Sequence, residues 1–384
     1  MSDAVGNGLL FFSTRQGRQT NCVLTVEVAR YVGELLGRQL VLPHCHTSPL
    51  AEHACASMPG IPPQRQTVVP LALDRVMRHS DLARCRSRAN TMPLLSYSDV
   101  PLSAEPRNAT CLTIVRKLDS APQKSYVEHH QRTGSSRCDA ELKGDEEMRT
   151  QVPLRFVKSV TIDGAHAFPP TAQTRRLLHS LAPTGDVFLN NAFMTFSKSY
   201  LTTKPFSLCD LPAVTEGVLR MERALEARLA MPPHAALCVH WRGEDFHHPH
   251  KLQRARLNES AASLAATAAA QVRRVAKAAG ARDVLVLSNA RFEALNELLY
   301  ALRAGGLRAK SPRELDGSAF GCATGYVYGT YAEMVVCSKA RHFLGSPRSS
   351  FSAHIHAMRA ARGNHGGMVT WLNHSGGSNP VFHL

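Results

Sequence analysis

The segment from His240 to Phe246 carries side chains that can bind phosphate. His240 and Arg242 are two positions apart at the end of an apolar run that begins at Ala235, and alternate residues of a strand share a face. A guanidinium there can bind phosphate oxygens bidentately and stabilise the charge that develops when a diphosphate leaves. Asp245 follows three residues after Arg242 and could orient it. The pattern predicts a phosphate site, and a structural ion pair with His240 in the core is the alternative.

A second group of candidates lies in the turn Gly17-Arg18-Gln19-Thr20-Asn21, between an expected strand and an expected helix. Ligands of doubly wound folds bind beyond the carboxyl ends of strands, so this turn is expected to face a binding site. Backbone amides at a helix start attract anions, Arg18 adds donors, and the amide of Asn21 can donate and accept. A capped helix start with a surface arginine fits the same residues.

A third group pairs Glu333 with the run from Phe343 to Phe351. In that run an apolar strand ends in a glycine-containing loop, and a helix is expected to start at Ser349 and Ser350. Hydroxyls and amide protons would converge there on a phosphate. Glu333 could accept hydrogen bonds from a base or a ribose. A serine that only caps the helix is the alternative.

The first half of the chain has the alternation of a parallel α/β sheet. Residues 8–13 are apolar, residues 24–35 repeat apolar side chains at helical spacing, and residues 40–42 form a second apolar run. Together residues 8–43 predict a βαβ unit of nearly minimal length. Residues 116–150 are poor in apolar side chains and predict a solvated insertion.

The second half repeats the alternation. It predicts helices at about 213–230, 259–279, 292–304 and 330–340, a helix opening at Ser349, and strands at 235–241, 284–287 and 342–345. The predicted fold class is therefore α/β, with two Rossmann-like domains at 1–205 and 206–384 that face a cleft.

Composition narrows the classes of function. The chain has 384 residues and a formal net charge of +15, which favours phosphorylated or polyanionic ligands. Two tryptophans and the lack of a long Lys/Arg run argue against nucleic acid, and no G-x-G-x-x-G follows a predicted strand, which argues against an oxidoreductase. The ten cysteines include no C-x-x-C pair, and their redox state is open.

The three groups of residues together resemble the protein O-fucosyltransferase family. The resemblance covers about residues 8–100 and 230–362. Its motifs are the glycine-containing loop at 17–21 that leads to Leu40-Val41-Leu42-Pro43, the H-x-R of His240 and Arg242 followed by Asp245 and Phe246, and Glu333 with F-[IL]-G-x-x-x-S-[ST]-F at 343–351.

The resemblance implies a GT-B architecture and an inverting fucosyltransferase that moves fucose from GDP-fucose to a Ser or Thr hydroxyl of a protein. It implies no cofactor and no metal. The donor would be bound by Arg18 and Asn21 from the N-terminal domain, by His240 and Arg242 at the pyrophosphate with Asp245 beside them, by Glu333 at the nucleoside, and by Ser349, Ser350 and Phe351 in the phosphate cradle. Arg242 would be the catalytic residue.

Some questions stay open at this point. Some branches of the family carry a glutamate between the loop glycines, where this chain has Arg18, so the general base is unassigned and Glu244 is a weak candidate. Another nucleotide sugar, a glycan acceptor, or an inactive nucleotide-sugar-binding protein are the alternatives. The family works in the ER and Golgi lumen, whereas the only early apolar run, Leu9 to Phe12, is too short for a signal peptide or a membrane anchor.

Overall fold

The structure is a computed structural model with two compact units. The first holds the described residues from Gly8 to Asn190, and the second holds those from Val214 to Leu372. The boundary expected at residue 205 lies outside the described residues. The structure describes residues 8–13, 71–72, 77, 94–96, 99–100, 105–115, 152–163, 176, 180, 185–190, 214–232, 236–242, 261–288, 292–315, 324–346, 349–363 and 369–372, and parts of 25–45 and 138–142.

The first unit contains a six-stranded sheet in the order β5-β2-β1-β8-β6-β7, in which every pair is parallel. The described residues between Thr25 and Leu36 are helical, so the predicted βαβ unit is confirmed. A separate two-stranded antiparallel ribbon joins His44–Cys45 (β3) to Leu71–Ala72 (β4). The strands of the large sheet are Leu9–Phe12 (β1), Gln39–Leu42 (β2), Leu94–Ser96 (β5), Arg107–Val115 (β6), Leu154–Asp163 (β7) and Asp186–Asn190 (β8).

Part of the expected solvated insertion is buried. Cys138 and Leu142 lie in the hydrophobic core of the first unit with Phe11, Val41 and Phe188, and Cys138 forms a disulfide with Cys111 on β6. The structure therefore differs from the expectation at these two residues. The reason is that one disulfide and one leucine can anchor a segment whose composition is otherwise polar.

Asp186 joins three strands at the amino edge of the first sheet. It is the first residue of β8, and its Oδ1 accepts from the backbone N–H of Leu9 at 2.8 Å while its Oδ2 accepts from Arg107 Nε at 2.7 Å. Burial lowers the pKa of nearby Arg38, and the charge of Asp186 opposes that shift. This carboxylate satisfies donors at the amino edge of the sheet, opposite to the carboxyl ends of the strands.

Replacing Asp186 with alanine is expected to lower the free energy of unfolding of the first unit by about 2–4 kcal/mol. The change leaves the partly buried amide of Leu9 and the side chain of Arg107 without their acceptor. Denaturant unfolding measures the effect. Arg155→Ala is the control, because Arg155 makes an exposed hydrogen bond to Asn108 and should change stability by less than about 0.5 kcal/mol. Equal stabilities of the two variants would contradict this role of Asp186.

The second unit contains a five-stranded parallel sheet in the order β11-β10-β9-β12-β13. Numbered along the chain this is 3-2-1-4-5, the order of a Rossmann sheet. Continuous aliphatic runs such as Val284 to Leu287 are typical of strands buried on both faces. The strands are Leu237–Trp241 (β9), Asp283–Ser288 (β10), Arg308–Lys310 (β11), His342–Gly345 (β12) and Val369–Trp371 (β13).

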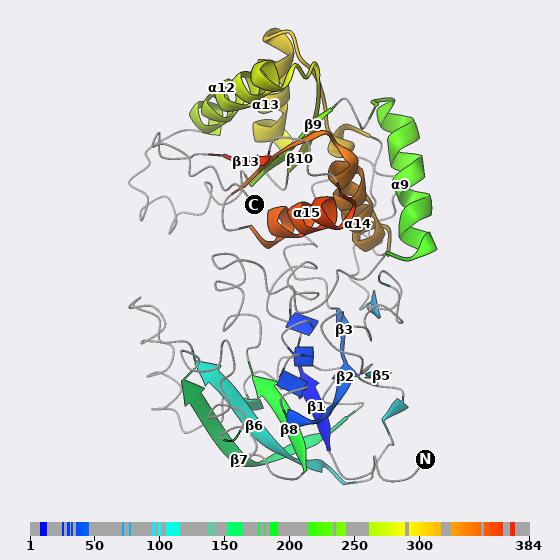
Figure 1. Ribbon diagram of the computed structural model, residues 1–384, viewed down its shortest axis with the longest axis vertical. Coiled ribbons are helices and arrows are strands. Elements are labelled where there is room, and N and C mark those ends of the chain that lie inside the picture. Colours follow the sequence, from blue (N-terminus) through cyan, green and yellow to red (C-terminus); the bar gives the residue numbers. More distant parts are fainter. Residues whose placement is uncertain are drawn as a thin grey trace. The chain divides into compact units, whose positions relative to one another are not determined.

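Helices cover both faces of the second sheet (Figure 1). Ala261–Ala279 (α12) and Phe292–Ala304 (α13) pack in one core with the side chains of Leu237, Val239 and Trp241. Thr324–Lys339 (α14) and Ser350–Ala361 (α15) lie on the other side of the sheet. The predicted α/β fold class is confirmed in both units.

Glycines with positive φ end helices α12 and α13 of this unit. Gly280 has φ +63°, and the amide of Ala281 bonds to the carbonyl of Ala276 at 2.9 Å, which is the Schellman pattern expected at a glycine end. Gly306 ends α13 in the same way, with φ +83°. None of the helices in the described part of the chain is long and apolar enough to cross a membrane.

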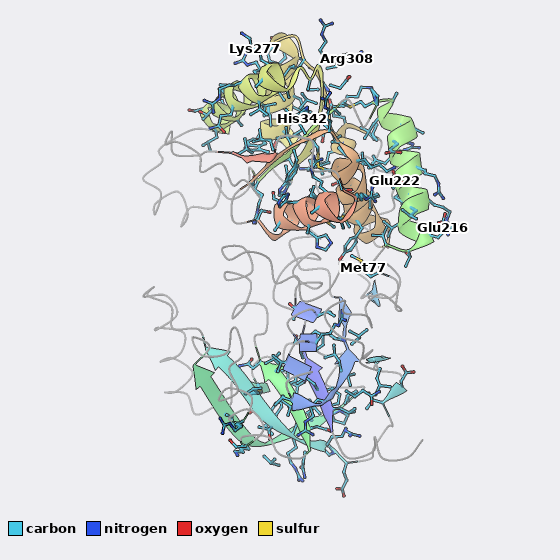
Figure 2. The ribbon with its side chains drawn as sticks, in the orientation of Figure 1. Met77, Glu216, Glu222, Lys277, Arg308 and His342 are labelled. Atoms are coloured by element: carbon cyan, nitrogen blue, oxygen red, sulfur yellow. A yellow bond between two sulfur atoms is a disulfide. The ribbon has the colours of Figure 1, made fainter. Side chains whose placement is uncertain are left out.

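Glu216–Leu229 (α9) is held to α14 by charge as well as by packing. Lys339 on α14 bonds to Glu222 and, at 3.0 Å, to Glu226. Figure 2 shows Glu222 on the side of α9 that faces α14. The ion pairs therefore add to the packing that holds α14 against α9.

Candidate functional site

The described residues of two of the three predicted groups lie where the strand order of the second sheet reverses, which is called its switch point. β9 and β12 are neighbours, but the chain leaves β9 toward β10 on one side and β12 toward β13 on the other. Ligands of open α/β sheets bind at the carboxyl ends of the two strands where the order reverses. His240 and Arg242 come from the end of β9, and Ser346 follows β12.

His240 is placed by the alternation of β9. All five residues of the strand are buried; Leu237, Val239 and Trp241 face α12 and α13, so Cys238 and His240 face the other side. There, His240 Nδ1 lies 2.7 Å from Ser352 Oγ on α15. The ring is buried, as the alternative of a core histidine expects, and it lies near the carboxyl end of the strand. Its role at a phosphate stays a prediction.

The Phe351 ring packs on this imidazole. The two ring centroids are 4.6 Å apart and their planes are inclined by 38°. Phe351 therefore restricts the rotation of His240 from one side, while Ser352 binds its Nδ1.

Ser346 ties the end of β9 to the end of β12. Its hydroxyl donates to the carbonyl of His240 at 2.8 Å and accepts from the backbone N–H of Arg242 at 3.0 Å. Ser288, at the end of β10, donates to the carbonyl of Trp241 at 2.7 Å. The backbone from which the Arg242 side chain projects is thus fixed on both flanks, and that side chain is partly exposed.

The amino end of α15 lies against His240. Ser349 is the N-cap, with φ −94° and ψ 121°, and its hydroxyl accepts from the amide of Ser352 at 3.4 Å. Ser350 is the first helical residue. Amides of a first helical turn attract anions, so this end of α15 adds positive potential beside His240 and Arg242.

A disulfide between β9 and α14 shows where Glu333 lies relative to the residues of β9. Cys238 on β9 bonds to Cys337 on α14, with Cα atoms 5.5 Å apart. From Cys238 to His240 the strand rises about 6.6 Å, and from Cys337 back to Glu333 the helix rises about 6 Å. α14 leads directly into β12 and so runs opposite to the strands, which makes both steps lead toward the carboxyl edge. Glu333 therefore lies on the sheet-facing side of α14, roughly level with His240.

The environment of Glu333 favours its neutral form. Burial raises the pKa of this carboxyl to about 7, and the positive charge of Arg313 works against the rise. Arg313 lies in the 3-10 turn Pro312–Glu314, which follows β11 at the carboxyl edge. A carboxyl with a pKa near neutrality can change charge when a ligand binds.

The structure brings together four of the predicted residues, namely His240, Arg242, Ser349 and Phe351, around β9, β12 and α15. Ser350 opens α15, and nothing is described of its side chain. Arg18, Asn21 and Asp245 lie outside the described residues, as does Glu244. Their roles stay predictions, as does that of Glu333 in binding a nucleoside.

Two serines of this network were not predicted. Ser346 and Ser352 bind the backbone and the ring of a residue more than 100 positions away. A serine directly after the glycine that ends β12, and a second serine three positions after the N-cap, were the available signals. Among the described residues no group of three metal-ligating side chains occurs.

Comparisons with known proteins find similarity in structure only. No protein-family model and no curated protein matches the chain. A crystal structure of POFUT1 in complex with GDP-fucose is 13% identical with a TM-score of 0.54, and the match covers 97% of this chain and 99% of that chain. The apo form of POFUT1 is 12% identical with a TM-score of 0.54, over 97% and 100% of the two chains.

A structure of NodZ alpha-1,6-fucosyltransferase soaked with GDP-fucose is 10% identical with a TM-score of 0.41, over 92% of this chain and 93% of that chain. The POFUT1 matches extend over nearly the full length of both chains. The chain therefore shares the GT-B type of fold of these POFUT1 structures, built from two Rossmann-like units.

Proposed function

We propose that the protein is a GDP-fucose-dependent fucosyltransferase that transfers fucose with inversion to a Ser or Thr hydroxyl of a protein. The observation that carries the proposal is the grouping of His240, Arg242 and the amino end of α15 at the switch point between β9 and β12. This grouping occurs in a fold shared with a POFUT1 structure in complex with GDP-fucose. A nucleoside diphosphate matches the positive potential of the site.

Each of these groups offers a different interaction with the diphosphate. Arg242 supplies a fixed charge and a fork of donors, His240 supplies one ring nitrogen, and the first turn of α15 supplies amide protons. These groups can balance the charge of a leaving diphosphate without a metal ion. The family resemblance predicts a donor-binding role for Asp245 as well, and the roles of Arg18 and Asn21 in binding the donor stay predictions.

The reaction exchanges one bond for another at the sugar. The acceptor hydroxyl oxygen forms a bond to C1 of fucose while the bond between C1 and the β-phosphate oxygen breaks, so the configuration at C1 inverts. The electron pair leaves on GDP, where Arg242 stabilises it. The hydroxyl proton goes either to a base such as Glu244 or to solvent in a leaving-group-driven reaction.

A calorimetric donor panel tests the proposal. GDP, GDP-fucose, GDP-mannose and UDP-sugars are titrated into the full-length protein, and transfer to Ser- or Thr-containing acceptors is followed by mass spectrometry. We expect GDP-linked compounds to bind and UDP-sugars to bind more weakly. Failure of every GDP-linked compound to bind would overturn the proposal, and GDP-fucose binding without transfer to any acceptor would favour an inactive binding protein.

The affinity for GDP is expected to rise with pH through about 7. Guanine presents N–H donors on its pairing edge, and only the ionised carboxylate of Glu333 can accept from two of them. Because burial raises the pKa of the free carboxyl, this acceptor is lost as the pH falls through that value. Calorimetry between pH 6 and pH 8, roughly one unit on each side, measures the slope.

Glu333→Gln is the matched control for the pH series. The amide keeps the shape of the side chain and cannot ionise, so its affinity should vary less with pH than that of the wild type. Identical pH profiles for the two proteins would assign the dependence to another group.

A further inference from the structure

The hydroxyl of Ser352 is the meeting point of two buried segments. Ser352 and Ser346 are 0% and 1% exposed, and His240 is 5% exposed. The backbone N–H of Ser346 donates to Ser352 Oγ at 3.0 Å, and His240 Nδ1 lies 2.7 Å from the same oxygen. Ser352 therefore joins the end of β12 to the side chain at the end of β9.

The protons of this group can be counted. A hydroxyl has one hydrogen to donate and two lone pairs to accept with, and a backbone N–H can only donate. The Ser346 amide therefore occupies one lone pair of Ser352 Oγ. Within the described part of the chain, the only acceptor at hydrogen-bond distance from the remaining hydroxyl hydrogen is His240 Nδ1.

The opposite assignment leaves a buried group unsatisfied. If Nδ1 carried the proton, it would donate to Ser352 Oγ, and the hydroxyl hydrogen would then have no acceptor among these residues. Burying a polar hydrogen without a partner is costly, so the geometry selects the tautomer in which Nδ1 accepts. In a neutral imidazole the proton is then on Nε2.

We infer that Ser352, held by Ser346, is a positioning residue that fixes His240 as the Nε2–H tautomer, so that the imidazole donates a hydrogen bond to a diphosphate oxygen. The inference rests on the proposed function for the identity of the ligand. The other tautomer would turn a lone pair toward an anion and repel it. In this arrangement His240 contributes one hydrogen-bond donor, and Arg242 and the amides of α15 supply the positive potential.

The tautomer can be measured without any ligand. The protein is labelled with ¹⁵N at histidine, and long-range ¹H–¹⁵N spectra at neutral pH report which ring nitrogen carries the proton. The His240 signal is assigned by its loss in His240→Gln. We expect an unprotonated Nδ1 and a protonated Nε2. A protonated Nδ1 in the wild-type protein would overturn the inference even if GDP binds.

A double-mutant cycle measures what the tautomer does. Ser352→Ala is expected to weaken GDP binding about tenfold, because Nδ1 loses its donor and both tautomers become populated. In a His240→Gln background the same change should cost less than about twofold, since a glutamine amide donates from the Nε2 position without a tautomer to fix. A merely structural role of Ser352 predicts equal losses in both backgrounds and would overturn the inference.

Two questions need controls. The first is whether a loss of affinity in a Ser352 variant comes from misfolding, and the second is whether a failure concerns this inference or the proposed function. Thermal unfolding shows whether Ser352→Ala is folded, and Ser352→Thr retains a hydroxyl and should restore part of the affinity. If neither variant folds, the wild-type tautomer alone decides. Failure of wild-type protein to bind GDP would instead overturn the proposed function, and with it the phosphate contact, whatever the tautomer.

Discussion

Replacing Arg242 with alanine is expected to reduce kcat for fucose transfer by about 10³-fold, with the fold intact. The change removes a fixed positive charge at the end of β9, which in the proposed reaction stabilises GDP as it leaves. The hydrogen bonds that shape this strand end use the backbone of Arg242, and alanine retains them. Single-turnover transfer assays measure the rate, and thermal unfolding verifies the fold.

Two further arginine variants sharpen this result. Arg242→Lys keeps the charge but loses the planar fork, so it should recover only part of the rate. Arg308→Ala is the matched control, because Arg308 pairs with Asp283 at the opposite edge of the same sheet and should leave kcat unchanged. Unchanged turnover in Arg242→Ala would remove this residue from the catalytic role proposed for it.

Replacing both Cys238 and Cys337 with alanine is expected to lower the free energy of unfolding of the second unit by about 4–5 kcal/mol. The bond closes a loop of 99 residues, and releasing a loop of that length increases the freedom of the unfolded chain by about this amount. The same bond holds α14 against β9, so nucleotide affinity should fall as well. Denaturant unfolding and GDP calorimetry measure the two effects.

The other described disulfide provides the comparison. Cys111 and Cys138 are 27 positions apart in the first unit, and replacing both should cost about 3–4 kcal/mol there. Unfolding of the second unit should be unaffected by that change. If the Cys238 and Cys337 pair could be removed with no loss of stability in the second unit, the bond would not constrain β9 and α14 as described.

The sequence predicted most closely the elements whose signals are local. The bounds of α13 and β12 agree with the expected 292–304 and 342–345, because glycines and aliphatic runs mark their ends. α14 begins at Thr324, six residues before the expected start. Glycines at 325 and 329 lower the helix propensity of that turn, and packing against α9 and α15 overrides it.

Strands β6 and β7 were not predicted, for a different reason. β7 forms an edge of its sheet, and its alternation of apolar and polar residues is interrupted where Val157 follows Phe156 and Ser159 follows Lys158, so the pattern that predicts a strand is broken in its middle. The register of β6 and β7 also shifts between Ala109 and Thr110. Such irregularity depends on the partner strand and leaves no local pattern.

The residues of the candidate site also differ in whether a local sequence pattern predicts them. The alternation of β9 predicts His240 and Arg242 on one face. The structure shows His240 on the face opposite to Leu237, Val239 and Trp241, and the face of Arg242, which follows the strand, stays a prediction. Ser346 and Ser352 act through hydrogen bonds to a residue 106 or 112 positions away. A contact of that separation follows from the order of the strands, which a single sequence does not reveal.

The burial of β9 on both faces has a consequence for how this protein can diverge. Each of its five residues, LCVHW, is enclosed by helices or by neighbouring strands, so a substitution there changes packing and ligand recognition together. If the protein has the proposed function, we expect a new donor preference to arise most readily in the segments that follow residues 242, 288 and 346, where the strands have already ended. We therefore expect β9 to tolerate few substitutions and the residues that follow the strand ends to tolerate more.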